Sequence, residues 1–339
     1  MRTLKFLVVA VALVALLAGC KQAKKEASSS LPNTAGAIGD ILVVISDDSW
    51  KGELGKVYQA VLEDQYPYLP QAEPYFKVSH VNKDVFSTTA VKYRNLIINK
   101  LGAEYKEPKF VIQRDVYAHP QVVVTVEAPN STDAAIYVKE NAARLREIFD
   151  QTEKDRYAAV VRKTAVQELS VAVQEKFGFD LYFPNGYELR TSKPNFMWIS
   201  QETAHASEGL IIFTNEYKGQ SSFTMENLVA DADRYLKQYV PGPSEGSYMM
   251  TTMTVPPKVE KITYKGRVWY RMRGFWDVHK EFMGGPFISY STYWEEKNEV
   301  LTLRAYVYSP KKDKRKPLLQ AEALIYNINL DGEKPKTAK

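Results

Sequence analysis

Residues 268–276, VWYRMRGFW, lie at the centre of the stretch that decides the fold. Apolar and aromatic runs of strand length surround this segment, at 262–264, 287–294 and 300–308. The turn pair Lys265-Gly266 precedes it, and charged residues separate the last two runs. This order of short strands and turns predicts an antiparallel meander.

Aromatic side chains are concentrated in this meander. Sequential neighbours point to opposite faces of an extended strand, and both are aromatic in Trp269-Tyr270, Phe275-Trp276 and Tyr293-Trp294. An open aromatic face would form a platform for sugars or peptides; in the alternative, helices near Leu228 and Leu318 cover it. The candidate binding residues are Trp269, Trp276, Tyr290, Trp294, Arg273 and Tyr248.

The meander belongs to a C-terminal lobe, residues 166–330. Before it, strands are predicted at 187–191, 196–200 and 209–215, and the apolar stripe from Leu228 to Tyr239 predicts a helix. After it, a last helix around Leu318 packs back on the sheet.

We expect an N-terminal lobe at residues 37–165. It begins with a buried strand at 41–45, which a helix follows. Helical patterns then run from the cap Asn130 to a stop at Gly178, across the junction of the lobes. Strands and helices mix without regular alternation, so we expect fold class α+β. The N-terminal lobe would hold a mixed sheet with helices, and the C-terminal lobe the aromatic-rich antiparallel meander with helices. The remaining strand candidates are 75–81, 95–99, 110–117 and 121–127.

The first residues predict export and lipidation. Arg2 and Lys5 precede an apolar run at 6–17, which ends in Leu17-Ala18-Gly19-Cys20. This is the order of a signal peptide, residues 1–19, that closes in a lipobox. The alternative, an uncleaved anchor, is too short, because crossing a bilayer takes roughly 20 apolar residues. We therefore expect acyl chains on Cys20.

The residues after Cys20 predict how the protein is held in the cell envelope. Residues 20–36 resemble a flexible tether, and 331–339 a disordered tail. Lys21, rather than Asp, follows the lipidated cysteine and favours the outer membrane. The face of that membrane, periplasmic or external, stays open.

Composition excludes several classes of function. Cys20 is the single cysteine, so its lipidation leaves no thiol for a disulfide, a metal site or a nucleophile. Without residues 1–19 the chain has 43 basic and 40 acidic residues, and the excess lies in the tether and tail. A neutral body gives no support to nucleic-acid binding. We expect no metal and no cofactor, because no metal-binding spacing occurs among the four histidines and no phosphate-binding glycine loop follows a strand.

The catalytic candidates are Asp277, His279 and Glu281. In an extended segment they would share one face and could move a proton or hold a cation; the alternative is a solvated strand end. Gly284-Gly285-Pro286 is either a tight turn or a place where a ligand approaches the backbone. The proline-rich loops at 66–74 and 241–249 are either recognition loops or rigid connectors.

With these segments in view, the chain resembles a family of Bacteroidota lipoproteins described as domain of unknown function 4837. The resemblance is carried by residues 69–74 (LPQAEP), 94–97 (RNLI), 241–249 (PGPSEGSYM) and 273–287, from RGFW to FMGGPF. It implies an envelope location and a single module of nearly full length, and it implies no reaction.

Three functional hypotheses follow. The first is an envelope lipoprotein, attached to the membrane by its lipid, that binds a glycan, peptide or protein partner without catalysis, along the aromatic face of the C-terminal lobe. The second is a carboxylate-dependent hydrolase of an envelope polymer, with Asp277 and Glu281 as acid and base. The third is a structural subunit of an envelope complex.

Overall fold

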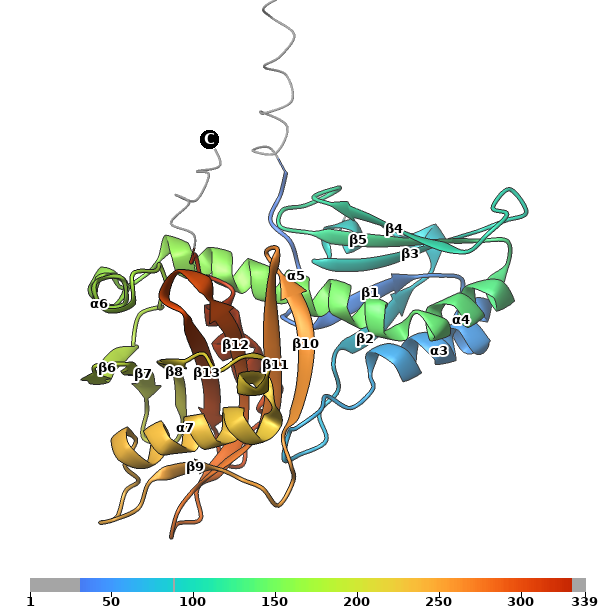
Figure 1. The fold of residues 1–339 in the computed structure, drawn as a ribbon. Coiled ribbons are helices and arrows are strands. Elements are labelled where there is room, and N and C mark those ends of the chain that lie inside the picture. Colours follow the sequence, from blue (N-terminus) through green and yellow to red (C-terminus); the bar gives the residue numbers. More distant parts are fainter. Residues whose placement is uncertain (1–30, 88, 331–339) are drawn as a thin grey trace, which may run out of the picture. The chain divides into compact units, whose positions relative to one another are not determined.

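The computed structural model describes residues 31–87 and 89–330. The expectations for the signal peptide, for the lipidated Cys20, for most of the tether and for the tail lie outside the described residues. Contacts divide these residues into two units, one of 31–61 with 76–142 and the other of 62–75 with 143–330. The two units and their sheets confirm an α+β fold with two lobes (Figure 1).

The N-terminal unit contains a mixed five-stranded sheet in the order β2-β1-β3-β5-β4. Neighbouring strands of this sheet are parallel, except that β4 and β5 are antiparallel. Ser46 caps α2 and Asn130 caps α4, each by accepting a backbone N–H with its side chain. The elements are β1 (Asp40–Val44), α2 (Asp47–Lys51), α3 (Glu53–Leu62), β2 (Lys77–Val81), β3 (Asn95–Leu101), β4 (Lys109–Arg114), β5 (Val122–Ala128) and α4 (Ser131–Glu140).

The C-terminal unit contains an antiparallel eight-stranded sheet, ordered β10-β11-β12-β13-β8-β7-β6, with β9 paired to β11. Lys265 and Gly266 both have positive φ, 49° and 76°, and form the expected turn between β10 and β11. The elements are α5 (Ala142–Lys163), α6 (Gln167–Phe177), β6 (Glu188–Lys193), β7 (Phe196–Glu202), β8 (Ser207–Glu216), α7 (Met225–Tyr239), β9 (Met249–Thr251), β10 (Lys258–Tyr264), β11 (Arg267–Val278), β12 (Gly284–Trp294), β13 (Glu299–Tyr308) and α8 (Arg315–Ile325).

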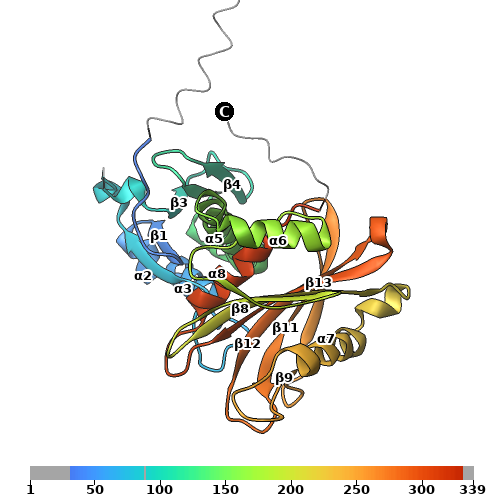
Figure 2. The same cartoon turned by 90° about the vertical axis from the view of Figure 1, so that its left-hand side faces the viewer.

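Helices cover both faces of this sheet. Figure 2 shows α7 on one side and α5, α6 and α8 on the other. Leu318, Ala321 and Leu324 of α8 pack with one set of strand residues, which includes Trp269, Tyr290 and Trp294. Leu228, Ala232 and Leu236 of α7 pack with the opposite set, which includes Met272, Trp276 and Phe287.

The prediction of an exposed aromatic platform is therefore wrong. Trp269 and Trp294 are 3% exposed, Trp276 2% and Tyr290 1%, so all four are core residues. The structure instead has the alternative arrangement, in which helices cover the second face of the sheet. Each such ring buries roughly 150–250 Å², which explains why a sheet covered on both faces is rich in them.

The segment 62–75 packs in the C-terminal unit, although we expected it in the lobe 37–165. Tyr66 and Leu69 join the core on the α8 side of the sheet. The Glu73 carboxylate accepts the backbone N–H groups of Lys314, at 2.8 and 3.0 Å, and of Arg315, at 2.8 Å. It thereby caps the first turn of α8, whose N–H groups have no partner within the helix. By contacts the boundary also falls between 142 and 143 rather than between 165 and 166, because α5 contributes Ala158 and Val161 to the same core.

Candidate functional site

The catalytic candidates do not share a strand face. Strand β11 ends at Val278, Lys280 has a φ of 69°, and the Glu281 N–H donates to the Val278 carbonyl at 3.0 Å. The chain therefore turns between His279 and Glu281, which corrects the extended geometry. Asp277 and His279 are exposed, and the His279 ring stacks on Tyr248 with centroids 4.8 Å apart. Within residues 31–87 and 89–330, no three His, Cys, Asp or Glu side chains gather as a metal site.

The glycines at 284–286 serve packing rather than a turn or a ligand. Gly284 and Gly285 begin β12, opposite Asp277 and Trp276 of β11. A Cβ on Gly285 would lie 2.1 Å from the Val307 carbonyl oxygen and 3.3 Å from Trp276 Nε1. The indole and β13 therefore occupy the space that a side chain would need.

The C-terminal unit contains a polar cavity of 410 Å³, within the size range of small-molecule sites. The segment 62–75 contributes Tyr68 and Tyr75 to its wall, α5 contributes Arg146, and β11 contributes Arg271 and Arg273. Both β11 arginines point to the face that carries Trp269, because alternate residues of a strand share a face. The first pairs with Glu260 of the neighbouring strand through Nη2, at 3.0 Å.

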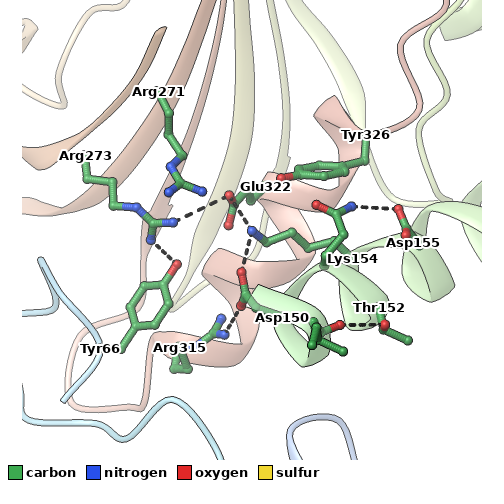
Figure 3. A network of polar contacts seen from close by, with 12 residues as sticks. Tyr66, Asp150, Thr152, Lys154, Asp155, Arg271, Arg273, Arg315, Glu322 and Tyr326 are labelled. Atoms are coloured by element: carbon green, nitrogen blue, oxygen red, sulfur yellow. Dashed lines mark hydrogen bonds and ion pairs between the residues drawn. The ribbon is translucent and has the colours of Figure 1, made fainter. Parts of the chain in front are cut away.

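A buried ion network includes Arg273 and Asp150 of this wall (Figure 3). Lys154 is fully buried, and its Nζ lies 2.6 Å from Asp150 Oδ2 and 2.8 Å from Glu322 Oε1. Arg315 Nη2 donates to the other Asp150 oxygen. Arg273 donates to the Tyr66 hydroxyl through Nη1, and its Nη2 is 3.9 Å from Glu322 Oε1. Residues from the segment 62–75, α5, β11 and α8 thus meet in one network.

The carboxyl and ammonium groups of this network are held in their charged forms. Burial raises the pKa of Asp150, but Lys154 and Arg315 outweigh it and bring that pKa below its usual range. Burial also raises the pKa of Glu322, and Lys154 and Arg273 lower it further than burial raises it. For Lys154, burial lowers the pKa, whereas the two carboxylates raise it well above the usual value. None of these three groups is poised to exchange a proton near neutral pH.

Donors exceed acceptors among the unpaired atoms of the network. In the described residues, Arg271 Nε and Arg315 Nε and Nη1 are buried nitrogens without a hydrogen-bond partner. Among the carboxylate oxygens of the network, Glu322 Oε2 is buried without a partner. A buried donor without a partner costs free energy, so these nitrogens are an unfavourable contribution within the network.

Two further cavities lie in the same unit. One, of 270 Å³, has a mostly apolar wall that includes Trp198, Met249 and Met283, together with the loop around Pro241. The other, of 340 Å³, is polar and lies between the end of β8 and α7. The loop at 241–249 therefore contributes to a cavity wall, and the loop at 66–74 contributes to the arginine-lined cavity.

Sequence reasoning named Arg273 but missed the network around it. Asp150 and Lys154 are spaced i,i+4 on α5, a pattern typical of exposed helix pairs, and yet both are buried. Tyr66 and Arg273 are 207 positions apart, and Lys154 and Glu322 are 168 apart. The one local signal was Arg271 and Arg273 at the period of a strand face.

None of the helices in the described part of the chain combines the length and apolarity needed to cross a membrane. No curated protein matches the chain. Among solved structures, it is similar to the Saccharomyces cerevisiae Ran-binding protein Mog1p, with 9% identity and a TM-score of 0.29 over 45% of this chain and 92% of that one. It is also similar to LpqN of Mycobacterium tuberculosis, involved in cell envelope biogenesis, with 14% identity and a TM-score of 0.26 over 43% and 79%. Likenesses of this size carry no functional inference.

Two family models divide the chain. The model of Domain of unknown function (DUF8532) matches residues 34–162, which include the segments 69–74 and 94–97. The model of Domain of unknown function (DUF4837) matches residues 166–327, which include 241–249 and 273–287. The implied single module is thus corrected to two matched regions. Residues 166–327 therefore match the family expected from the sequence, the one described as domain of unknown function 4837.

Proposed function

We propose that this protein is a lipid-anchored lipoprotein of the cell envelope that binds a ligand without catalysis, in the arginine-lined cavity of its C-terminal unit. The ligand is a glycan, a peptide or a segment of a partner protein, and the anchor holds the protein at the outer membrane. The observation that carries the proposal is the cavity of 410 Å³ with Arg271 and Arg273 in its wall, where Arg273 is part of a buried ion network.

The ion network supports a preorganised binding wall. Arg315 lies over one face of the Tyr66 ring, with Cζ 3.9 Å from the centroid, and Arg273 lies 5.0 Å from the same centroid. Tyr290 donates to Glu322 and Tyr326 lies beside it, so the carboxylate that faces Arg273 is itself held in place. Donors held in this way lose little entropy when a ligand binds.

The protonation states favour binding over hydrolysis. A hydrolase of the carboxylate type needs an acid that is protonated near neutral pH, whereas Asp150 and Glu322 have lowered pKa values. Burial raises the pKa of Glu208 and of Asp233. Neither residue lines any of the three cavities described above.

The anchor is tested by mass spectrometry of the protein from its own membranes. We expect residues 1–19 to be absent and Cys20 to carry acyl chains, and a Cys20→Ser variant to leave the membrane fraction. Recovery of residues 1–19 joined to an unmodified Cys20 would contradict this part of the proposal.

The binding role is tested by passing labelled envelope glycans, peptides and envelope extracts over the immobilised full chain. We expect one class to be retained by the wild-type protein and released by the Arg271→Gln variant. The matched control is Arg267→Gln on the same strand, outside the cavity. Turnover of a retained polymer would favour the hydrolase instead, and retention of nothing would remove the binding role.

A further inference from the structure

The cavity presents two guanidinium groups side by side. Arg271 and Arg273 occupy alternate positions on β11, opposite Glu260 and Lys258 of β10. Glu260 is shared, because Oε2 accepts from Arg271 at 3.0 Å and Oε1 lies 3.0 Å from Lys258 Nζ. The Nη2 of Arg271 donates to Glu260, and its Nε is buried without a partner. One Arg271 nitrogen is therefore paired while donor capacity remains at the cavity wall.

Arg273 lacks a close carboxylate. Its nearest one, Glu322, is 3.9 Å away and already accepts from Lys154 and Tyr290. The closer partner of Arg273 is the neutral hydroxyl of Tyr66. Its side chain is 11% exposed, and a cation in such a recess is stabilised strongly by an opposite charge.

Positive charge exceeds negative charge in this part of the unit. Lys154, Arg271, Arg273 and Arg315 share three carboxylates, those of Asp150, Glu260 and Glu322. The rest of the cavity wall is balanced, with Arg146 and Lys258 against Asp64 and Glu147. The unpaired buried atoms have the same imbalance, with guanidinium nitrogens in the majority. One oxyanion would complete the set, and guanidinium groups are well suited to planar carboxylates and to phosphates.

Other residues of the wall offer rings and hydrogen-bond acceptors. Tyr68 and Tyr75 are partly exposed in the cavity, and each is held in place. The Tyr68 hydroxyl donates to the Pro256 carbonyl at 3.0 Å, and Arg146 lies over Tyr75 with Cζ 5.1 Å from the centroid. Such rings can pack against a flat apolar face of a ligand.

Acidic and amide side chains of the same cavity are hydroxyl acceptors. Asp64, Gln65 and Glu147 line it beside the two tyrosines. Carboxylates accept hydrogen bonds from hydroxyl groups. The cavity therefore suits a molecule with one oxyanion, several hydroxyls and a ring.

We propose that the arginine-lined cavity binds an acidic sugar, with its oxyanion on Arg271 and Arg273 and its ring against Tyr68 and Tyr75. This inference rests on the proposed binding function and names the ligand class. A carboxylated sugar and a sugar phosphate share the required chemistry, and the experiment distinguishes them.

The test is isothermal titration calorimetry of the detergent-solubilised full chain at neutral pH. The probes are glucuronic acid, glucose 6-phosphate, glucose, acetate and inorganic phosphate. We expect one acidic sugar to bind at least about tenfold more tightly than glucose and than its bare anion, because charge-assisted hydrogen bonds and ring contacts add. The tighter of the two acidic sugars identifies the source of the oxyanion. Higher salt should weaken this binding.

Three variants and a control connect the binding to these residues. Arg271→Gln and Arg273→Lys should each weaken it at least about tenfold, and Tyr75→Leu should weaken glucuronic acid and glucose alike. Arg267→Gln, whose Nη1 donates to the Tyr293 carbonyl outside the cavity, should stay within about twofold. If an arginine variant melts far below the wild type, its loss of binding could come from unfolding. The Tyr75→Leu variant and the salt dependence of binding to the wild type then test the site.

Other outcomes overturn the inference. Equal affinity for glucose and the acidic sugars, or an Arg267→Gln loss as large as that of Arg271→Gln, would exclude the acidic-sugar site. Failure of every small probe, with an envelope polymer still retained by the wild type and released by Arg271→Gln, would refute this ligand class and leave the binding function standing. If nothing is retained, both fail.

Discussion

Lys154→Met removes the ammonium group between two buried carboxylates. Lys154 is fully buried, and its Nζ is 2.6 Å from Asp150 and 2.8 Å from Glu322. Methionine fills a similar unbranched volume without charge. The substitution therefore keeps most of the packing and tests the electrostatic contribution of the network.

The expected loss follows from the partners that remain. Asp150 keeps Arg315, whereas Glu322 keeps the Tyr290 hydroxyl and Arg273 at 3.9 Å. Removing one member of a buried ion pair costs roughly 3–5 kcal/mol, and the partners that remain place this variant near the lower limit. For a unit of this size, about 3 kcal/mol corresponds to a drop in melting temperature on the order of 6–12 °C.

Thermal unfolding of the full chain in mild detergent, followed by tryptophan fluorescence, measures the effect. The control is Lys163→Met, the same substitution at an exposed position of α5. It should change the unfolding free energy by less than about 0.5 kcal/mol. The loss in Lys154→Met should thus be many times larger than that of the control.

A second substitution separates charge from packing. Adding Glu322→Gln to Lys154→Met removes the carboxylate that the first substitution leaves uncompensated. The double variant should therefore lose less stability than the sum of the losses of the two single variants. A Lys154→Met variant that melts within about 2 °C of the wild type, or two strictly additive losses, would refute the view of the network as a coupled electrostatic unit.

Three further predictions concern stability. The lowered pKa values of Asp150 and Glu322 contribute stability above their unfolded values of about 4, which is lost as the pH falls, while the raised pKa of Lys154 preserves its contribution until the pH rises past about 10.5. Melting temperature should therefore fall below about pH 4, less steeply in Glu322→Gln than in the wild type; an equally steep fall in the two proteins would contradict this. Glu73→Ala leaves the first N–H groups of α8 without their acceptor and should cost roughly 1–2 kcal/mol in denaturant unfolding, a loss that an unchanged midpoint would rule out. Gly285→Ala places a methyl group 2.1 Å from the Val307 carbonyl oxygen and should lower the melting temperature by the equivalent of roughly 1–3 kcal/mol, whereas a neutral result would mean that β12 and β13 can shift apart.

Local patterns predicted the elements of the fold well because they act through backbone geometry. Asn130 caps α4, and Gly178 ends α6 with a φ of 86°, a left-handed conformation that glycine adopts without strain. Lys265-Gly266 forms the predicted turn. The short strand β9 was missed, because three residues are too few for a periodic pattern.

The candidate site was predicted only in part. Alternation along β11 places Arg273 on the face of Trp269, as a two-residue period requires. The pattern did not reveal that Arg271 lines the same cavity or that Tyr66 is the hydrogen-bond partner of Arg273. The extended reading of 277–281 was wrong because a turn with positive φ at Lys280, a residue with no turn preference, intervenes.

By itself, then, the sequence determined where strands, helices and turns begin, which side chains share a strand face, and that Cys20 is the only thiol. These properties depend on neighbouring residues and on φ and ψ. Only the tertiary structure decided that helices cover both faces of the aromatic sheet, that the segment 62–75 packs under α8, and that Lys154 meets Glu322. The physical reason is that covering a face and pairing a buried charge are contacts between distant parts of the chain, which a local period does not encode.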